Sequence, residues 1–380
     1  SDDRLPIDPS SDVPDGFTED QRGQPGGFIG DPDVMDTWAT SSLSPQIAGG
    51  WEHDPDLWSR VYPMDVRPQA HEIIRTWLFS SVVRAHLEDD CLPWSNAAIS
   101  GWILDPDRKK MSKSKGNVVT PMDLLDEYSS DAVRYWAASG RPGTDTAFDI
   151  GQMKIGRRLA IKVLNASKFV LSMGVVEDVS AITRPLDLSM LAMLRDIADR
   201  ATQAFENYNY ARALELAESF FWTFTDDYVE LVKERAYGGQ GEQAAASAKA
   251  ALSLALSVQL RLFAPFLPFT TEEVWSWVND SSIHRASWPQ VAEFSALPEG
   301  DPGVLEATGQ ALSGVRKVKS EQKVSMRARV SSATISGPGA DIERIRQAME
   351  DLAAAGSIEG MNVTDGSETL QVEAELAPVE

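Results

Sequence analysis

Helical periodicity from about residue 151 to about residue 280 restricts the possible folds of this chain more than any other pattern in it. Apolar residues recur there three or four positions apart, as the buried face of a helix requires, at Leu191, Leu194, Ile197 and Ala198 and again at Leu214, Leu216, Phe220 and Phe221. Residues 270–273 (Thr-Thr-Glu-Glu) have the spacing of a capping box at a helix start. The pattern predicts an antiparallel bundle of about four or five helices over residues 151–295.

The segment before the bundle has a different pattern. Residues 1–32 are rich in Pro, Gly and Asp without a sustained period, which predicts an extended connection. A helical pattern from about His71 to Leu87 leads to the apolar run 98–104, a candidate buried strand. Strand, helix and strand in this order predict a parallel α/β sheet over residues 33–120, followed by a helical connector over 121–150. At the start of that connector, Thr120 and Pro121 have the chemistry of a helix start.

After about residue 298 the pattern changes again. A helix from about Gly303 leads to residues 324–330, where apolar residues alternate with polar ones. A period of two predicts a strand with both arginines, Arg327 and Arg329, on its open face. A helix over about 341–355 and one or two further strands complete a small α/β unit over 303–380. The chain is therefore predicted to be a multidomain protein that combines α/β and all-α parts.

Composition excludes several classes of protein. No run approaches the roughly 20 apolar residues that a membrane span needs, and no signal peptide is recognisable. Cys91 is the only cysteine, which excludes a disulfide framework or a cysteine-rich zinc ribbon and fits the reducing cytoplasm.

The net charge of −22 argues against a nucleic-acid partner, but a local basic patch can still hold phosphate. Two segments concentrate cations: Lys154, Arg157, Arg158, Lys162 and Lys168 in the first, and Arg316, Lys317, Lys319, Lys323, Arg327 and Arg329, beside the single acid Glu321, in the second. Either segment could also be an ordinary solvated helix face.

The strongest local signal is residues 110–114 (Lys-Met-Ser-Lys-Ser). The run follows a predicted strand through the polar turn 105–107, and Gly116 and Asn117 separate it from the next helix. Open α/β sheets bind ligands at the carboxyl ends of their strands, where two lysines can neutralise a triphosphate. The alternative for the isolated run is a flexible basic loop or a localisation signal.

The same run resembles the KMSKS loop of the class I aminoacyl-tRNA synthetases. Four further segments resemble other parts of the same enzymes. They are 33–38 (Asp-Val-Met-Asp-Thr-Trp), 67–77 (Arg-Pro-Gln-Ala-His-Glu-Ile-Ile-Arg-Thr-Trp), 165–169 (Asn-Ala-Ser-Lys-Phe) and 282–284 (Ser-Ile-His). Together they are similar to the valyl family and extend over essentially the whole chain. The resemblance implies the C-terminal half of a Rossmann-like catalytic sheet, an anticodon-binding helix bundle and a small C-terminal domain.

The resemblance also implies roles for individual residues. Lys110 and Lys113 are the expected catalytic cations, and the expected ATP-binding residues are Ala70, Glu72, Gly101, Ile103, Lys110, Met111, Ser112, Lys113 and Ser114. Many relatives have glycine and aspartate where this chain has Ala70 and Glu72, so the fine geometry at the ribose differs. A structural strand glycine is the alternative for Gly101.

Trp38, Ile73 and Trp77 are expected to form the valine side-chain pocket. Two rigid indoles and a β-branched residue suit a small apolar slot, although plain core residues would give the same spacing. The implied substrates are valine, tRNA(Val) and ATP with Mg²⁺, with no protein-bound metal and a monomeric parent protein. The expected tRNA-binding residues are Lys154, Arg157, Arg158, Lys162, Lys168, Arg327 and Arg329, which would contact backbone phosphates.

Parts of such a synthetase are missing from the sequence. It contains no HIGH tetrapeptide, and neither the family's editing domain nor a coiled-coil arm is recognisable. The chain is therefore expected to be a C-terminal fragment, prepared or natural, that is inactive in aminoacylation by itself. Two alternatives stay open at this point: a stand-alone tRNA-binding module with an inert catalytic remnant, and an enzyme of the same chemistry that takes isoleucine.

Overall fold

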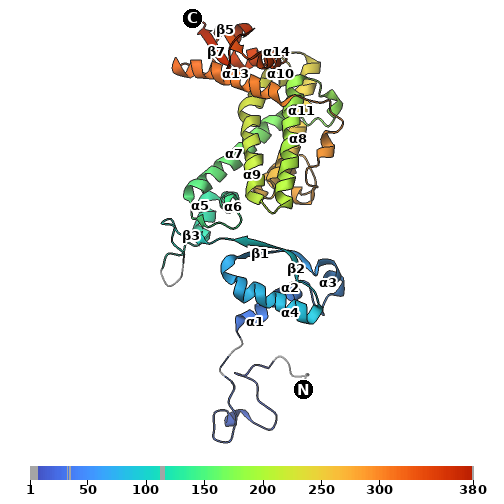
Figure 1. Cartoon of the computed structure of the whole chain (residues 1–380), viewed down its shortest axis with the longest axis vertical. Helices are drawn as coiled ribbons and strands as arrows, with labels where there is room; N and C mark the ends of the chain where they lie inside the picture. The colour runs from blue at the N-terminus through green and yellow to red at the C-terminus, as the bar shows by residue number, and fades with distance from the viewer. Residues whose placement is uncertain (1–6, 32, 34–35, 112–115, 379–380) are drawn as a thin grey trace. The chain divides into compact units, whose positions relative to one another are not determined.

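The structure is a computed structural model that describes residues 7–31, 33, 36–111 and 116–378 (Figure 1). Its contacts divide the chain into two compact units, Ser1–Ser100 and Gly101–Glu380. Within the described ranges, no helix combines the length and the apolar character needed to cross a lipid bilayer.

The first unit is built on one strand–helix–strand segment. Strands β1 and β2 pair in parallel, from Met64 opposite Trp94 to Ala70 opposite Ser100. This order confirms the predicted parallel pair. The elements are η2 (Glu19–Gln21), α1 (Thr37–Ser41), α2 (Ser44–Ala48), α3 (Pro55–Val61), β1 (Met64–Ala70), the 3-10 turn η3 (His71–Ile73), the π turn η4 (Ile74–Leu78), α4 (Phe79–Asp89) and β2 (Trp94–Ser100).

The prediction of one buried strand over 98–104 was wrong. Strand β2 ends at Ser100, and Trp94 is its only buried residue. A Cβ atom on Gly101 would lie 2.3 Å from the backbone carbonyl of Thr144, so this glycine permits a close backbone crossing. The Trp102 N–H then donates to the Asp145 carboxylate at 2.8 Å instead of continuing the ladder. A separate short strand, β3 (Ile103–Leu104), pairs in parallel with β4 (Thr146–Ala147).

The second unit consists mainly of helices, drawn from teal to red in Figure 1. A π turn joins helices α9 and α10 without a non-helical residue between them. The elements after β3 are α5 (Met122–Tyr128), α6 (Ser130–Ser139), β4, α7 (Ile150–Ser172), η6 (Val179–Ala181), α8 (Pro185–Glu206), α9 (Tyr210–Thr223), the π turn η7 (Phe224–Tyr228), α10 (Val229–Ala236), α11 (Glu242–Phe263), α12 (Pro268–Ser276), η8 (Ile283–Arg285), η9 (Val291–Phe294) and α13 (Pro302–Glu321).

Helix α7 shows why this region folds as a bundle. Asp149 caps it by accepting from the N–H groups of Gly151 and Gln152. One face is buried, at Met153, Gly156, Leu159, Ala160, Val163, Ser167 and Val170. A Cβ atom on Gly156 would lie 2.6 Å from the Tyr135 side chain, so this glycine lets α6 and α7 pack closely.

The bundle core confirms the helical prediction. Phe220 and Phe221 are 3% and 2% exposed, and the Phe221 ring meets the Phe263 ring edge-on with centroids 5.4 Å apart. The aromatic cluster of α9 is therefore packed inside the bundle, as the sequence pattern indicated.

Both predicted helix caps in this unit were wrong. Helix α5 begins at Met122, and Thr120 does not cap it. Helix α12 begins at Pro268, two residues before the expected capping box. Its cap comes from Asp131 of α6, whose carboxylate accepts from the Phe269 N–H at 3.1 Å and the Thr270 N–H at 2.7 Å. Sequence spacing cannot reveal a cap that lies 138 positions away.

Replacing Asp131 with alanine is expected to lower the free energy of unfolding by about 1–2 kcal/mol. The change removes the α12 cap and the hydrogen bond from the Thr270 hydroxyl. Urea unfolding of the chain measures the loss. Asp123→Ala, an exposed carboxylate in the first turn of α5, is the control and should change stability by less than about 0.5 kcal/mol. Equal effects of both variants would contradict the capping role.

A three-stranded sheet closes the chain, with strand order β6-β5-β7. Strand β5 pairs in parallel with β6 and antiparallel with β7. The expected single helix over 341–355 is two helices that break at Gln347. The elements are β5 (Val330–Gly337), α14 (Gly339–Arg346), α15 (Met349–Gly356), β6 (Ile358–Asp365) and β7 (Gln371–Leu376).

The predicted strand over 324–330 was also wrong. Only Val330 belongs to β5, and the preceding residues turn: the Ala328 N–H donates to the Ser325 carbonyl at 2.9 Å. The Ser325 hydroxyl accepts from the Arg327 N–H at 3.2 Å, a local contact that competes with strand pairing. Arg327 is therefore exposed on a turn and not on a sheet face.

Candidate functional site

Two indoles meet in the first unit. The Trp38 ring of α1 and the Trp77 ring of η4 have centroids 6.5 Å apart and planes inclined by 42°. The Trp77 Nε1–H donates to the Ser41 carbonyl at 2.6 Å, which ties η4 to the helix that carries Trp38. Ile73, in the 3-10 turn before η4, is half-buried. The structure thus brings together the two tryptophans that the sequence assigned to one apolar slot.

Arg67, which sequence reasoning missed, supports this pair. It lies on β1, is 9% exposed, and its guanidinium carbon is 3.4 Å from the Trp77 ring centroid and 5.3 Å from that of Trp94. Within the part of the chain that the structure describes, its Nε and one Nη have no hydrogen-bond partner. Burial lowers the pKa of this guanidinium. The sequence signal that could have found Arg67 is the period of two in a strand, because Arg67 and Gln69 share the buried face of β1.

The residues expected at the ATP ribose lie at the carboxyl end of β1 and just after it. Ala70 is the last residue of the strand, and Glu72 is exposed on the 3-10 turn η3. Between them, the His71 Nδ1 lies 3.3 Å from the Ser100 carbonyl at the end of β2. The ribose contact itself stays a prediction.

The lysine-rich run begins at the edge of β3. Leu104 and Lys110 form an antiparallel bridge, and the Lys110 ammonium lies 4.4 Å from the Trp102 ring centroid. Met111 is half-buried. The predicted ATP-binding residues Ser112, Lys113 and Ser114 lie outside the described residues.

Asp105 joins the two sides of this run, and sequence reasoning treated it only as part of a polar turn. It is 7% exposed, and its carboxylate accepts from the Lys109 N–H at 2.7 Å and from the Asn117 amide at 2.8 Å. These two hydrogen bonds lower the pKa of the carboxyl group. The signal that could have found it is the tendency of aspartate to bond the backbone of its own turn.

The remaining predicted nucleotide contacts are Gly101 and Ile103. The close crossing at Thr144 accounts for the glycine structurally, so its adenine contact stays a prediction. Ile103 is 48% exposed. Among the residues that the structure describes, no group of three or more His, Cys, Asp or Glu could hold a metal ion.

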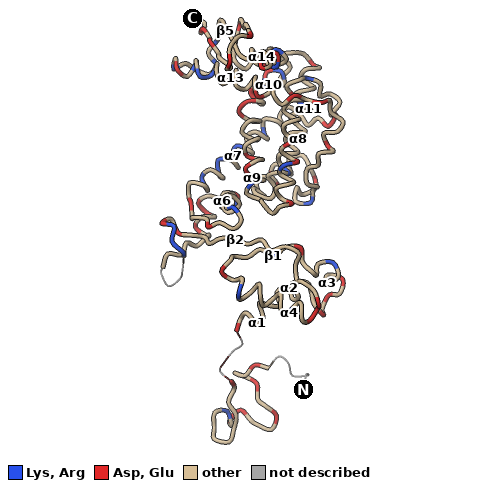
Figure 2. Tube along the Cα trace, viewed as in Figure 1, with Lys and Arg blue, Asp and Glu red and all other residues tan. Residues whose placement is uncertain are grey.

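Helix α7 carries the first cationic segment (Figure 2). Lys154, Arg158 and Lys162 follow one another at four-residue spacing and therefore share one side of the helix. Lys162 pairs with Asp226 of η7 at 3.0 Å, and Arg157 donates to the Glu127 carbonyl at 3.0 Å.

Lys168, the last cation of this segment, is exposed. Its ammonium lies 6.0 Å from the Trp277 ring centroid.

Distant acids pair with two cations of the second segment. Arg316 lies 3.9 Å from Asp227, and Arg329 pairs with Glu359. Lys319 is 1% exposed and donates to two carbonyls, so the sequence was wrong to include it in a surface patch. The segment itself contains only one acid, Glu321, because Asp227 belongs to η7 and Glu359 to β6.

Family models match both units. A model described as tRNA synthetases class I (I, L, M and V) matches residues 11–149, and one described as the anticodon-binding domain of tRNA ligase matches residues 187–334. A valine–tRNA ligase of Thermobifida fusca is 65% identical over 99% of this chain, and one of Salinispora tropica is 56% identical over 98%. The chain belongs to the valyl family of class I aminoacyl-tRNA synthetases.

Membership in this family concerns a part of longer proteins. The chain spans 43% of the Thermobifida relative and 46% of the Salinispora one. A solved LeuRS of Agrobacterium radiobacter K84, crystallised with tRNA and LeuAMS, is similar in fold with a TM-score of 0.58. That similarity covers 70% of this chain and 34% of the LeuRS at 22% identity, so it supports a mixed α/β fold with helical domains.

Proposed function

We propose that the protein containing this chain is a valine–tRNA ligase. It would activate valine with MgATP to valyl-adenylate and transfer the valyl group to tRNA(Val). The observation that carries the proposal is the tethered pair of indoles at Trp38 and Trp77, because two rigid aromatic walls suit a small branched side chain. The valine–tRNA ligases among the relatives support the choice of amino acid.

The lysine-rich run supplies electrostatic stabilisation in this proposal. The valine carboxylate attacks the α-phosphorus of ATP, and negative charge develops on the departing pyrophosphate. Lys110 and Lys113 would stabilise that charge without transferring a proton. Asp105 supports this role indirectly, because its bonds to Lys109 and Asn117 hold the two ends of the run.

The ATP pocket would take its ribose contacts from Ala70 and Glu72 and its adenine contacts from Gly101 and Ile103. An exposed carboxylate such as Glu72 can accept hydrogen bonds from adjacent sugar hydroxyls.

The cations of α7 would hold tRNA by its backbone phosphates, with Arg327 and Arg329 as further contacts. Lys154 and Arg158 favour this role because both are exposed on one side of a long helix. Phosphate contacts position RNA without reading its sequence.

Replacing Arg158 with alanine tests the phosphate role. We expect weaker binding of this chain to tRNA(Val), and a slope of log affinity against log salt that is smaller by about one, since one phosphate contact is lost. The measurement is competition binding at several salt concentrations. The control is Arg200→Ala on α8, which removes an exposed arginine that already pairs with Asp196 at 3.0 Å. Equal salt slopes for both variants and the parent chain would contradict the assignment.

A chimera tests the enzymatic function. The full chain replaces the equivalent 43% of the Thermobifida fusca relative, and ATP–pyrophosphate exchange is measured with valine and with isoleucine. Exchange that depends on valine is the expected result. Exchange with isoleucine alone would reassign the substrate. A folded chimera that binds tRNA but exchanges neither amino acid would favour a tRNA-binding module instead.

A further inference from the structure

Two attachments hold the Trp77 indole. Its Nε1–H donates to the Ser41 carbonyl at 2.6 Å, which fixes one edge of the ring. The Arg67 guanidinium lies 3.4 Å from its centroid, which supports one face. Because Ser41 and Trp38 belong to the same short helix α1, the position of Trp77 is coupled to that of Trp38.

Arg67 is costly in this position. Its side chain is nine-tenths buried, burial lowers the pKa of its guanidinium, and two of its nitrogens have no hydrogen-bond partner in the described ranges. A buried charge without a carboxylate partner is usually less stable than an apolar residue of similar size. Contact with the faces of Trp77 and Trp94 offsets part of this cost. Stability alone therefore does not explain an arginine here.

We propose that Arg67 is a positioning residue that sets the width of the valine slot. This inference rests on the proposed function, because Trp77 must be a wall of that slot. Valine and isoleucine differ by one methylene, which a pocket can reject only if its walls do not move apart. The guanidinium carbon lies 3.4 Å from the ring centroid, so this side chain would keep the indole from tilting away from Trp38. Lysine cannot replace it, because an ammonium is not planar.

The test compares Arg67→Met and Arg67→Lys with the parent sequence in the chimera. The rate of pyrophosphate exchange gives kcat/KM for valine and for isoleucine. We expect the preference for valine to fall about tenfold in both variants, since one methylene in a pocket is worth roughly 10–200-fold. We also expect the melting temperature of Arg67→Met to stay unchanged or to rise, which a purely structural residue would not show. Arg60→Met, at an exposed arginine of α3 paired with Asp56, is the matched control.

Near-UV circular dichroism of the chain itself supplies a second readout. The spectrum assigned to Trp77 is the difference between the parent chain and Trp77→Phe. We expect this difference to change when it is measured in the Arg67→Met background. An identical difference in both backgrounds, or unchanged discrimination in a chimera that activates valine, would overturn the inference. A parent chimera that exchanges neither amino acid would overturn the proposed function, and with it the role of Arg67 in a valine slot.

Discussion

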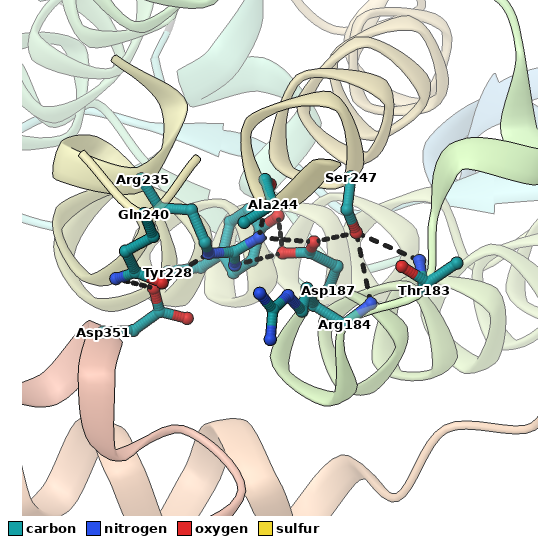
Figure 3. Close-up of polar contacts among 9 residues, drawn as sticks. All are labelled: Thr183, Arg184, Asp187, Tyr228, Arg235, Gln240, Ala244, Ser247 and Asp351. Carbon is teal, nitrogen blue, oxygen red and sulfur yellow. Dashed lines mark hydrogen bonds and ion pairs between the residues drawn. The ribbon is translucent and has the colours of Figure 1, made fainter. Parts of the chain in front are cut away.

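Replacing Arg235 with methionine is expected to lower the free energy of unfolding by about 3–5 kcal/mol, as breaking a buried ion pair does. The side chain is 1% exposed and lies between two carboxylates (Figure 3). One Nη donates to Asp187 at 2.7 Å, and Nε donates to Asp351 at 2.8 Å. Burial opposes the charge of Arg235, but the hydrogen bonds that it donates to Asp187 raise its pKa. Methionine would leave both carboxylates buried without a cation.

The effect should extend beyond the site because the network connects four helices. Asp187 of α8 also accepts from the Tyr228 hydroxyl at 2.8 Å and from Ser247 of α11 at 2.6 Å. Asp351 belongs to α15, so Arg235 on α10 joins the bundle to the C-terminal α/β part. Hydrogen exchange at α15 is therefore expected to increase in the variant.

Guanidinium unfolding of the parent chain and of Arg235→Met measures the difference. Arg200→Met is the matched control, because the Arg200–Asp196 pair on α8 is exposed and should contribute less than about 1 kcal/mol. If Arg235→Met does not fold, Asp351→Asn keeps the test open with an expected loss of about 1–3 kcal/mol. A loss below 1 kcal/mol for both variants would show that the network does not hold the two parts together.

Replacing Lys110 with alanine is expected to reduce kcat/KM for valine-dependent pyrophosphate exchange about a hundredfold, or roughly 3 kcal/mol of transition-state stabilisation. The reason is the proposed contact with the departing pyrophosphate, which strengthens as negative charge develops. Lys110 is the first residue of the lysine-rich run, and its ammonium lies 4.4 Å from the Trp102 ring centroid.

The adjacent residue supplies the control for this variant. Lys109 is exposed, and its ammonium lies 3.9 Å from Asp107 on the same turn. Lys109→Ala removes one positive charge, as Lys110→Ala does, but it removes no proposed contact with ATP. Exchange should therefore stay within about twofold of the parent chimera. Similar losses in both variants would indicate a general effect of charge on ATP binding. A Lys110→Ala variant as active as the parent would exclude the catalytic role.

Local patterns in the sequence predicted what depends on neighbouring residues. The period of the apolar residues in α7, α8 and α9 predicted the bundle, and the packing of Phe220 and Phe221 confirms it. The order strand, helix and strand predicted parallel pairing, which β1 and β2 show, although the second strand was placed at 98–104 instead of 94–100. The assignment to the valyl family followed from short motifs, and the relatives confirm it.

Specific polar contacts, which apolar periodicity does not reveal, defeated the other predictions. Residues 324–330 alternate like a strand, but a serine-based turn competes with pairing. Lys319 reads as a surface cation, yet it caps carbonyls inside the C-terminal part. Asp131 lies in the first turn of its own helix α6, yet it caps α12. Lys319 and Asp131 have partners outside their own helices, whereas the turn at Ser325 is a local contact.

The sequence by itself determined the helical bundle, the parallel strand pair and the family, because periodicity and short motifs are local properties. Only the tertiary structure decided which polar side chains have partners. Arg67 against Trp77, Arg235 between Asp187 and Asp351, and Asp131 at α12 all join residues from separate elements. The physical reason is that burial makes an unpaired charge costly, so the elements packed around a buried charge decide how much of that cost is offset. Which groups surround a buried charge depends on how the elements pack and cannot be seen from neighbouring residues in the sequence.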